Sequence, residues 1–319
     1  MSNIKQTIIA AAVAVTFTTT AQADGLSDSL PLGKSLAAGH ELPLPLGISA
    51  NVFFMEQDMT AQSIKINTPS LPINMATGQF DLLLPPENWF PPLQGLPVKS
   101  KKIESRATST TAKLDAWLLP FLNVYAVAGY VDGETTASGI SLDDDKLTKD
   151  KLTQILPPQT PSQVVDGLFS NLDSLRKLVP DSFSVPYSGS VYGVGATLAV
   201  GYNQFFASVD ANYTESHLDI GDSTIEAFVI APRVGITGEL GGLSGSLYFG
   251  AMYQDIDENQ KGTANLSGQQ VGYDVISQAE DEWNYLVGAN LKASESWHYG
   301  IEVGFSKRTH VMATLNYRF

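Results

Sequence analysis

The C-terminal end of the chain constrains its fold most strongly. Apolar side chains alternate with mainly polar ones up to the final residue: Val311, Ala313, Leu315, Tyr317 and Phe319 alternate with Met312, Thr314, Asn316 and Arg318. A period of two residues over this length predicts a β-strand whose two faces meet different surroundings. One face meets an apolar environment and the other a more polar one.

Nine further stretches show the same alternation. It is clearest at 204–213, 228–237, 283–292 and 298–305, and noisier at about 48–59, 103–118, 121–136, 187–200 and 242–256. These runs exceed the usual globular strand of about five or six residues. They reach the length of about nine to eleven residues that a tilted strand needs to cross a bilayer. The sequence therefore predicts about ten strands, or twelve if the link 60–102 contains a hairpin.

The links between these runs alternate in length. Short links fall near 119–120, 201, 240–241 and 294–296, and the intervening links are 60–102, 137–186, 219–223, 257–281 and a tight turn near Lys307-Arg308. No long link occupies a place that should be short. Transmembrane barrels show this order, with short periplasmic turns and longer external loops. An even strand number also puts both chain ends on the periplasmic side.

Lipid imposes closure on such a sheet because it offers the backbone no hydrogen-bond partner. We therefore expect an all-β fold, a closed antiparallel up-and-down transmembrane β-barrel, with apolar side chains toward lipid and polar ones toward the lumen. A soluble secreted β-protein is the rival interpretation.

The N-terminal segment has the features of a secretory signal. Lys5 precedes the apolar run Ile8 to Phe17, and Ala21-Gln22-Ala23 fits a cleavage site after Ala23. The run is shorter than the roughly twenty residues of a membrane-spanning helix. We expect residues 1–23 to be a signal peptide, 24–47 a periplasmic lead-in or short plug, and 48–319 the barrel.

The two ends together resemble the Gram-negative outer-membrane β-barrel proteins as a broad class, and no particular family is identified. The resemblance rests on Ala21-Gln22-Ala23 and on the ending Leu315-Asn316-Tyr317-Arg318-Phe319. It implies an outer-membrane location, contact with outer-membrane lipid, and recognition of Leu315, Tyr317 and Phe319 by the barrel-assembly machinery. We expect a monomer.

Strand parity predicts which polar side chains face the lumen: Lys113, Asp115, Asn123, Asp210, Arg233, Asn290, Lys292, Glu302 and Arg318. Two interpretations remain open. The charges neutralise one another inside a narrow, filled barrel, or they line a conduit for a small solute. On the opposite face, aromatic residues are expected at the membrane boundaries, namely Trp283, Tyr285, Tyr299, Phe305, Tyr317 and Phe319.

One segment of the link 137–186 has a helical pattern. Thr160 and Pro161 predict its start, apolar residues follow at helical spacing to Val179, and Pro180 ends it. The apolar face of this short helix needs a cover. It packs on other loop residues, or it narrows the lumen as a plug.

Candidate chemistry is sparse. The chain has four histidines, no cysteine and a net charge of −14, so nucleic acid is not an expected partner. His298 and His310 are expected at opposite ends of the barrel, whereas His217, beside Ser216 and Glu215, could approach His310. The acidic segment Asp255 to Asn259 lacks the pattern of a calcium loop.

We expect no enzymatic activity, cofactor or metal, and favour a passive channel or binding barrel for a small, amphipathic solute. The alternatives are a surface-recognition, adhesion or structural barrel that uses the long acidic loops, and a lipid-modifying enzyme.

Overall fold

The computed structural model describes residues 30–32, 43–74, 79–81, 83–177, 179–240, 242–266 and 269–319. The predicted signal peptide and most of the predicted lead-in lie outside this part of the chain. Among the residues described, no helix is both long and apolar enough to cross a membrane.

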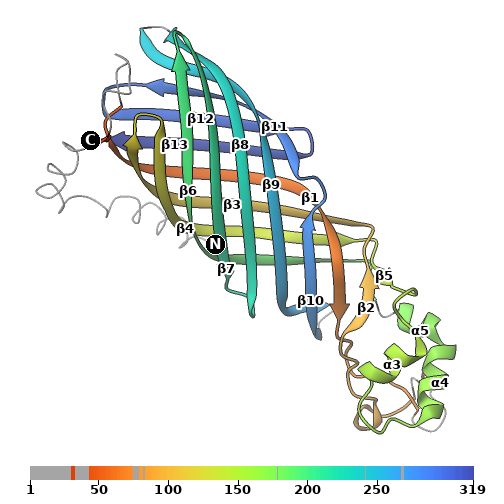
Figure 1. The fold of residues 1–319 in the computed structure, drawn as a ribbon. Helices are drawn as coiled ribbons and strands as arrows, with labels where there is room; N and C mark the ends of the chain where they lie inside the picture. Colours follow the sequence, from red (N-terminus) through yellow and green to blue (C-terminus); the bar gives the residue numbers. More distant parts are fainter. Residues whose placement is uncertain are drawn as a thin grey trace, which may run out of the picture.

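Ten long antiparallel strands form a closed ring (Figure 1). In ring order they are β1 (Leu46–Ile66), β3 (Lys102–Leu119), β4 (Leu122–Ser138), β6 (Ser182–Tyr202), β7 (Phe205–Leu218), β8 (Ser223–Leu240), β9 (Leu243–Leu266), β11 (Trp283–Lys292), β12 (Trp297–Phe305) and β13 (Arg308–Arg318). The ring closes where β13 pairs with β1, from Gly47 opposite Arg318 to Gln57 opposite Arg308. The predicted closed up-and-down barrel of ten strands is confirmed.

An additional strand changes the wall beyond the ends of β11, β12 and β13. The segment 257–281, predicted to be an external link, instead continues β9 to Leu266 and returns as β10 (Gln269–Ala279). β10 pairs with β9 on one side and with residues 59–66 of β1 on the other. The prediction of a loop there was wrong because the strands extend well past the membrane.

The wall therefore has two parts with different strand numbers. We call the ten-stranded part next to the chain ends the membrane half. We call the part beyond it, in which β10 replaces β11, β12 and β13, the outer half. Eight strands wall the outer half, so the barrel narrows at the junction, since diameter grows with strand number.

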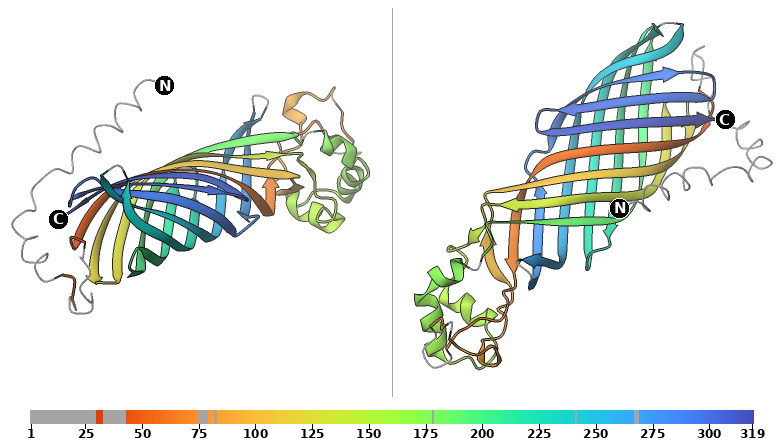
Figure 2. Two further views of the ribbon diagram at one scale, coloured as in Figure 1. Left: turned by 90° about the horizontal axis from the view of Figure 1, so that it is seen from above. Right: turned by 180° about the vertical axis from the view of Figure 1, so that it is seen from behind.

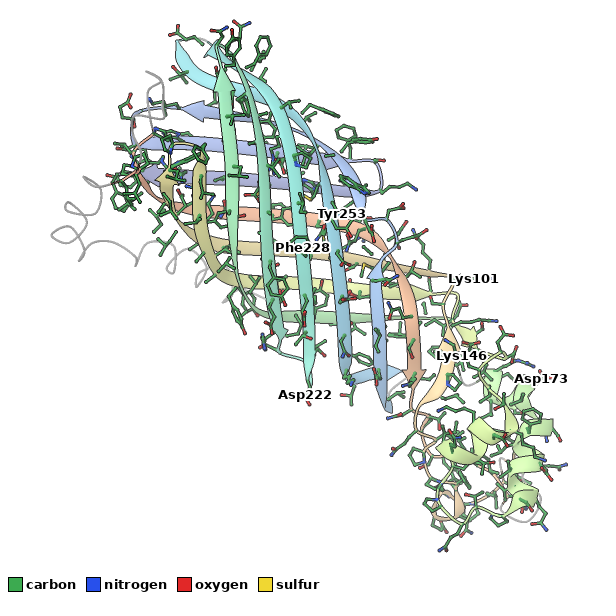
Figure 3. All side chains as sticks on the ribbon, viewed as in Figure 1. Lys101, Lys146, Asp173, Asp222, Phe228 and Tyr253 are labelled. Carbon is green, nitrogen blue, oxygen red and sulfur yellow. The ribbon has the colours of Figure 1, made fainter. Side chains whose placement is uncertain are left out.

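The outer surface of the membrane half is apolar. Outward side chains include Leu198, Val209, Val234, Leu247, Val287 and Ile301, all exposed. Aromatic rings border this surface toward the outer half, namely Phe54, Tyr130, Tyr192, Tyr213, Phe228, Tyr253, Trp283 and Phe305, and toward the chain ends, namely Tyr202, Phe205, Trp297, Tyr317 and Phe319. Figure 3 labels Phe228 and Tyr253, which lie part-way along the barrel.

The spacing of these rings fits a bilayer. Phe205 and Tyr213 are eight residues apart on β7, a span of about 20 Å along the barrel axis for a strand rising about 3.4 Å per residue at a tilt of about 40°. Rings also contact one another across strands, with centroids 5.4 Å apart for Tyr253 and Trp283 and 5.0 Å apart for Trp297 and Tyr317. All six aromatic residues predicted for the boundary face outward, although Tyr285 and Tyr299 lie one step inside it.

The outer half has the reverse polarity. Its outward side chains include Asp58, Arg106, Asp132, Glu134, Asp255 and Asp257. Its inward side chains include buried Met59, Ile103, Val185, Ile256, Tyr273 and Val275. The expectation of a polar interior is wrong for this half, because beyond the membrane the outer surface meets water and the interior becomes the hydrophobic core.

The described residues of 67–101 and 139–181 form a cap on the outer half (Figures 1 and 2). It contains η2 (Pro86–Asn88), β2 (Leu96–Lys99), β5 (Ser141–Leu142), α3 (Lys149–Ile155), α4 (Ser162–Ser170) and α5 (Leu172–Arg176). The alternative of a membrane-crossing hairpin in 60–102 is wrong, because its described strand residues are the end of β1 and β2, which pairs with β1 and β5.

The predicted helix between Pro161 and Val179 is two helices. They meet at Asn171, whose backbone leaves the helical region at φ −117° and ψ 35°. Pro161 occupies the N-cap position, and the Thr160 hydroxyl donates to the Pro157 carbonyl at 2.7 Å. Buried Leu168 and Leu175 belong to the same apolar core as Ile103 and Val275, so the cap packs directly onto the interior of the outer half.

Candidate functional site

The lumen of the membrane half contains a cavity of about 500 Å³ to which all ten strands of the ring contribute. Toward the outer half its wall is mainly apolar, with Val131, Val191, Ile225, Val229, Met252 and Ile256. Toward the chain ends its wall is mainly polar, with Asn51, Lys113, Thr197, Asp210, Arg233, Asn290, Glu302 and Thr314. The cavity thus offers an apolar surface and a polar surface to one molecule.

An ion pair crosses the polar part of the lumen. Arg233 on β8 donates from Nε to Glu302 Oε2 on β12 at 2.8 Å and from Nη2 to Oε1 at 3.3 Å. The Tyr248 hydroxyl donates to Glu302 Oε2 at 3.1 Å, and His310 Nε2 lies 3.5 Å from Oε1. The carboxylate is 1% exposed, so these donors replace the water that it loses on burial.

A second carboxylate is held by neutral donors. Asp210 accepts from the Tyr125 hydroxyl at 2.9 and 3.1 Å, from the Thr197 hydroxyl at 2.6 Å and from Asn212 Nδ2 at 3.2 Å. Lys113 Nζ lies 4.9 Å from the centroid of the Tyr125 ring, within the range of a cation–π contact. These groups form one polar belt with the Arg233–Glu302 pair.

A separate buried cluster lies near the chain ends. Arg318 Nη1 is 3.0 Å from Asp115 Oδ2, Asn123 Nδ2 donates to the same oxygen at 2.8 Å, and Arg318 Nε donates to the Leu44 carbonyl at 2.8 Å. Gly47 pairs with both Asp115 and Arg318 from the strand between them. A Cβ atom on Gly47 would lie 2.5 Å from Asp115 Oδ1, so glycine is what lets this ion pair reach across β1.

The nine residues predicted for the lumen thus fall into three places. Lys113, Asp210, Arg233, Asn290 and Glu302 line the cavity. Asp115, Asn123 and Arg318 form the buried cluster. Lys292 lies at the end of β11 and pairs with Glu295 at 2.9 Å in the following turn.

The outer end of the cavity is closed by packed side chains. On each of the eight strands of the outer half at least one inward residue is buried, for example Gln57, Ser105, Thr135, Tyr187, Leu218, Ser223, Glu258 and Ser277. Glu258 accepts from the Thr135 hydroxyl at 3.1 Å, from Gln260 Nε2, and from the Ser277 hydroxyl at 3.5 Å. These buried side chains close the cavity at this end.

The histidines do not come together. His217 faces outward, where its Nδ1 lies 2.6 Å from the Tyr192 hydroxyl, whereas Ser216 beside it faces the lumen. His310 is buried on the inner face of β13, which is far from β7 in the ring order. The predicted approach of His217 to His310 is therefore wrong. Within the described part of the chain, no three His, Asp or Glu side chains are grouped to hold a metal ion.

Sequence reasoning missed two inward-facing charges, Glu258, which lines the cavity, and Arg308. Arg308 was assigned to a turn, but it is the first residue of β13, lies opposite Gln57 and is 1% exposed. The alternation of β13 could have predicted the inward position of Arg308, because Arg308 and His310 lie on the same face of the strand as Met312 and Thr314. The neighbouring Lys307 lies in the turn, and its presence led to the assignment of Arg308 to the same turn.

No protein-family model matches the sequence, and no curated protein matches it. Among solved structures it is similar to the β domain of the Bordetella autotransporter BrkA, with 9% identity over 86% of this chain and 100% of that chain and a TM-score of 0.34. It is also similar to the COG4313 outer membrane channel from Pseudomonas putida F1, with 8% identity over 88% and 98% and a TM-score of 0.33.

A third similar structure is the toluene transporter TbuX of Ralstonia pickettii, with 11% identity over 86% of this chain and 90% of that chain and a TM-score of 0.27. These likenesses concern the fold alone. The closed ring of ten strands and its apolar outer surface place this chain in the broad class of outer-membrane β-barrel proteins.

Proposed function

We propose that this barrel binds a small amphipathic solute in its lumen and admits it from the end that carries the chain termini. The observation that carries this proposal is the cavity of about 500 Å³, which is apolar toward the outer half and polar toward the chain ends. A cavity of this size is in the range of small-molecule sites. Its apolar wall suits the body of a solute. Polar side chains at either end of the cavity, the polar belt toward the chain ends and Gln57 and Gln254 toward the outer half, suit a head group.

The closed outer half makes binding the primary event in this proposal, with passage as a gated step. The layer around Tyr187, Leu218 and Glu258 is buried, and Tyr187 and Leu218 pack in one apolar cluster with Val131. Purified protein in planar bilayers is therefore expected to show no sustained open ion conductance. Steady conductance steps from the wild-type barrel would favour a permanently open channel instead.

Filling the cavity tests the proposal directly. Ala227 lines the apolar wall, so Ala227→Trp is expected to weaken binding of a water-soluble amphipath such as phenylacetamide by at least about tenfold, since the ring occupies the same space. The protein would be held in lipid nanodiscs, with binding measured by equilibrium dialysis. Heat-modifiable migration on gels would show that the barrel has formed.

Ala126→Trp is the matched control, because Ala126 is exposed on the outer face of β4. It makes the same substitution without entering the lumen and is expected to leave phenylacetamide binding unchanged. Equal binding by wild type and Ala227→Trp, or equal loss in both variants, would rule out the cavity as the site.

A further inference from the structure

Arg308 is a buried cation for which the described residues supply no side-chain partner. Its side chain is 1% exposed, and none of Nε, Nη1 and Nη2 has a hydrogen-bond acceptor among the described residues. No carboxylate in the described part of the chain lies within 4.0 Å of it. A guanidinium group has five N–H donors and stays charged, and burying such a group unpaired is strongly unfavourable.

The surroundings hold Arg308 in this position. Asn284 on β11 donates from Nδ2 to the Arg308 carbonyl at 2.7 Å, and its Oδ1 accepts from the Arg308 and Lys307 backbone N–H groups at 3.3 Å. A Cβ atom on Gly304 would collide with both Asn284 and His310. The strand end is thus fixed by three hydrogen bonds and a close packing contact, which preorganises the guanidinium.

Arg308 projects to the same face of the wall as the cavity-lining residues and lies beside them, without itself lining the cavity. It lies directly opposite Gln57 on β1, and directly paired residues of neighbouring strands project to the same face. Gln57 and Gln254 both line the cavity, and the Oε1 atom of each is buried without a donor. Glu258, the buried acid that lines the cavity in the outer half, already accepts from Thr135, Gln260 and Ser277.

We infer that Arg308 binds the carboxylate of an organic acid whose apolar body occupies the luminal cavity. This inference rests on the proposed function and names the chemical class of the solute. A carboxylate matches the planar fork of a guanidinium with two parallel hydrogen bonds. It would also neutralise the charge that the protein leaves unpaired, whereas the amide oxygens of Gln57 and Gln254 would supply no charge.

The test compares two probes of nearly equal shape, phenylacetate and phenylacetamide, on the full-length barrel in nanodiscs. Wild type is expected to bind phenylacetate about 10- to 100-fold more tightly, the effect of one hydrogen-bonded charged group. Arg308→Met is expected to remove this preference and keep phenylacetamide binding. Arg308→Lys is expected to retain part of it. Lys307→Met removes the adjacent, exposed cation and is expected to keep the preference intact.

Thermal unfolding supplies a second measurement on the same proteins. Saturating phenylacetate is expected to raise the unfolding temperature of wild type and of Lys307→Met but not that of Arg308→Met. Without ligand, Arg308→Met is expected to unfold at a higher temperature than wild type, because an uncompensated charge is gone. A variant that unfolds at a lower temperature would show that Arg308 is satisfied within the protein and would overturn the inference.

The outcomes separate this inference from the proposed function. If wild type binds neither phenylacetate nor phenylacetamide, the proposed function and the role of Arg308 are both rejected. If wild type binds both probes equally, or if Arg308→Met keeps the preference for phenylacetate, the cavity remains a solute site and the role of Arg308 is rejected.

Discussion

On strand β9, Leu247 in the membrane half faces outward while Ser246 faces the lumen, and in the outer half Asp257 faces outward while Ile256 faces inward. The strand continues without interruption, and its hydrogen bonds to β8 keep one register throughout. Only the surroundings change, from lipid to water. Within one sheet, therefore, the solvent at each level decides which face carries apolar side chains.

The interiors of the two halves also differ. The membrane half tolerates a cavity and a belt of charges, since lipid already surrounds its apolar face. The outer half has water on its outside and is stabilised by a continuous core with the cap. Substitutions at matched positions of the two halves should therefore change the free energy of unfolding by very different amounts.

The largest expected difference concerns ion pairs. Arg233→Met leaves Glu302 buried in the lumen without its cation and is expected to lower the free energy of unfolding by about 3–5 kcal/mol. Lys261→Met removes a partner of Asp274 at 3.9 Å on the exposed outside of the outer half, at a cost of at most about 1 kcal/mol. Guanidinium unfolding in vesicles, followed by tryptophan fluorescence, measures both.

A double variant sharpens this prediction. Arg233→Met combined with Glu302→Leu is expected to recover most of the lost stability, because neither charge is then left unpaired. A double variant as unstable as Arg233→Met alone would show that the loss of stability comes from packing and not from the buried, unpaired carboxylate of Glu302.

The next effect concerns the core of the outer half. Ile256→Ala is expected to lower the free energy of unfolding by about 2–5 kcal/mol, because Ile256 is 4% exposed within the shared core. On the same strand, Ser246→Ala in the membrane half is expected to cost less than about 1 kcal/mol, since its hydroxyl accepts one exposed hydrogen bond from Asn290. Similar losses at both positions would contradict the division into two interiors.

A smaller effect is expected on the outer surface. Leu247→Arg places a charge in the lipid-facing belt and should cost about 2–4 kcal/mol near the bilayer midplane. Asp257→Arg makes a comparable change above the membrane, opposite Glu226, and should change stability by less than about 1 kcal/mol. If the two variants were equally stable, the assignment of the membrane level would be wrong.

The smallest effect is expected in the cap. Arg176 pairs with Asp144 at 2.9 Å and also with Asp173 on the exposed surface. Arg176→Ala is expected to cost between about 0 and 1 kcal/mol. The loss should shrink further in high salt, which screens exposed charges. A loss that salt leaves unchanged would indicate that the alkyl part of Arg176 packs on the cap core.

Local alternation was sufficient to predict the membrane half. Runs such as 283–292 and 311–319 contrast an apolar face with a polar one, and lipid enforces that contrast at nearly every step. In β10 the contrast is weaker, because Ile276 faces outward between Asp274 and Gln278. A strand outside the membrane has no such constraint on its outer face, and its pattern resembled that of a loop.

The site was predictable by face but not by partner. Parity identifies Arg233 and Glu302 as polar residues on inner faces, yet their contact spans 69 positions in sequence and depends on how the ring closes. The pair of Asp115 and Arg318 likewise depends on Gly47 lying between them. The point along the barrel axis at which packed side chains replace the cavity depends on the number of strands in the wall there. The local alternation of a single strand does not predict that number.

The transition from ten strands to eight has a consequence for the order of assembly. In the outer half the seam is the pairing of β1 with β10, and it uses no residue beyond Ala279. That ring has all of its segments before residues 283–319 are placed. The C-terminal strands fill the remaining gap between β9 and β1, so we expect the final closure to take place within the lipid-embedded portion of the wall.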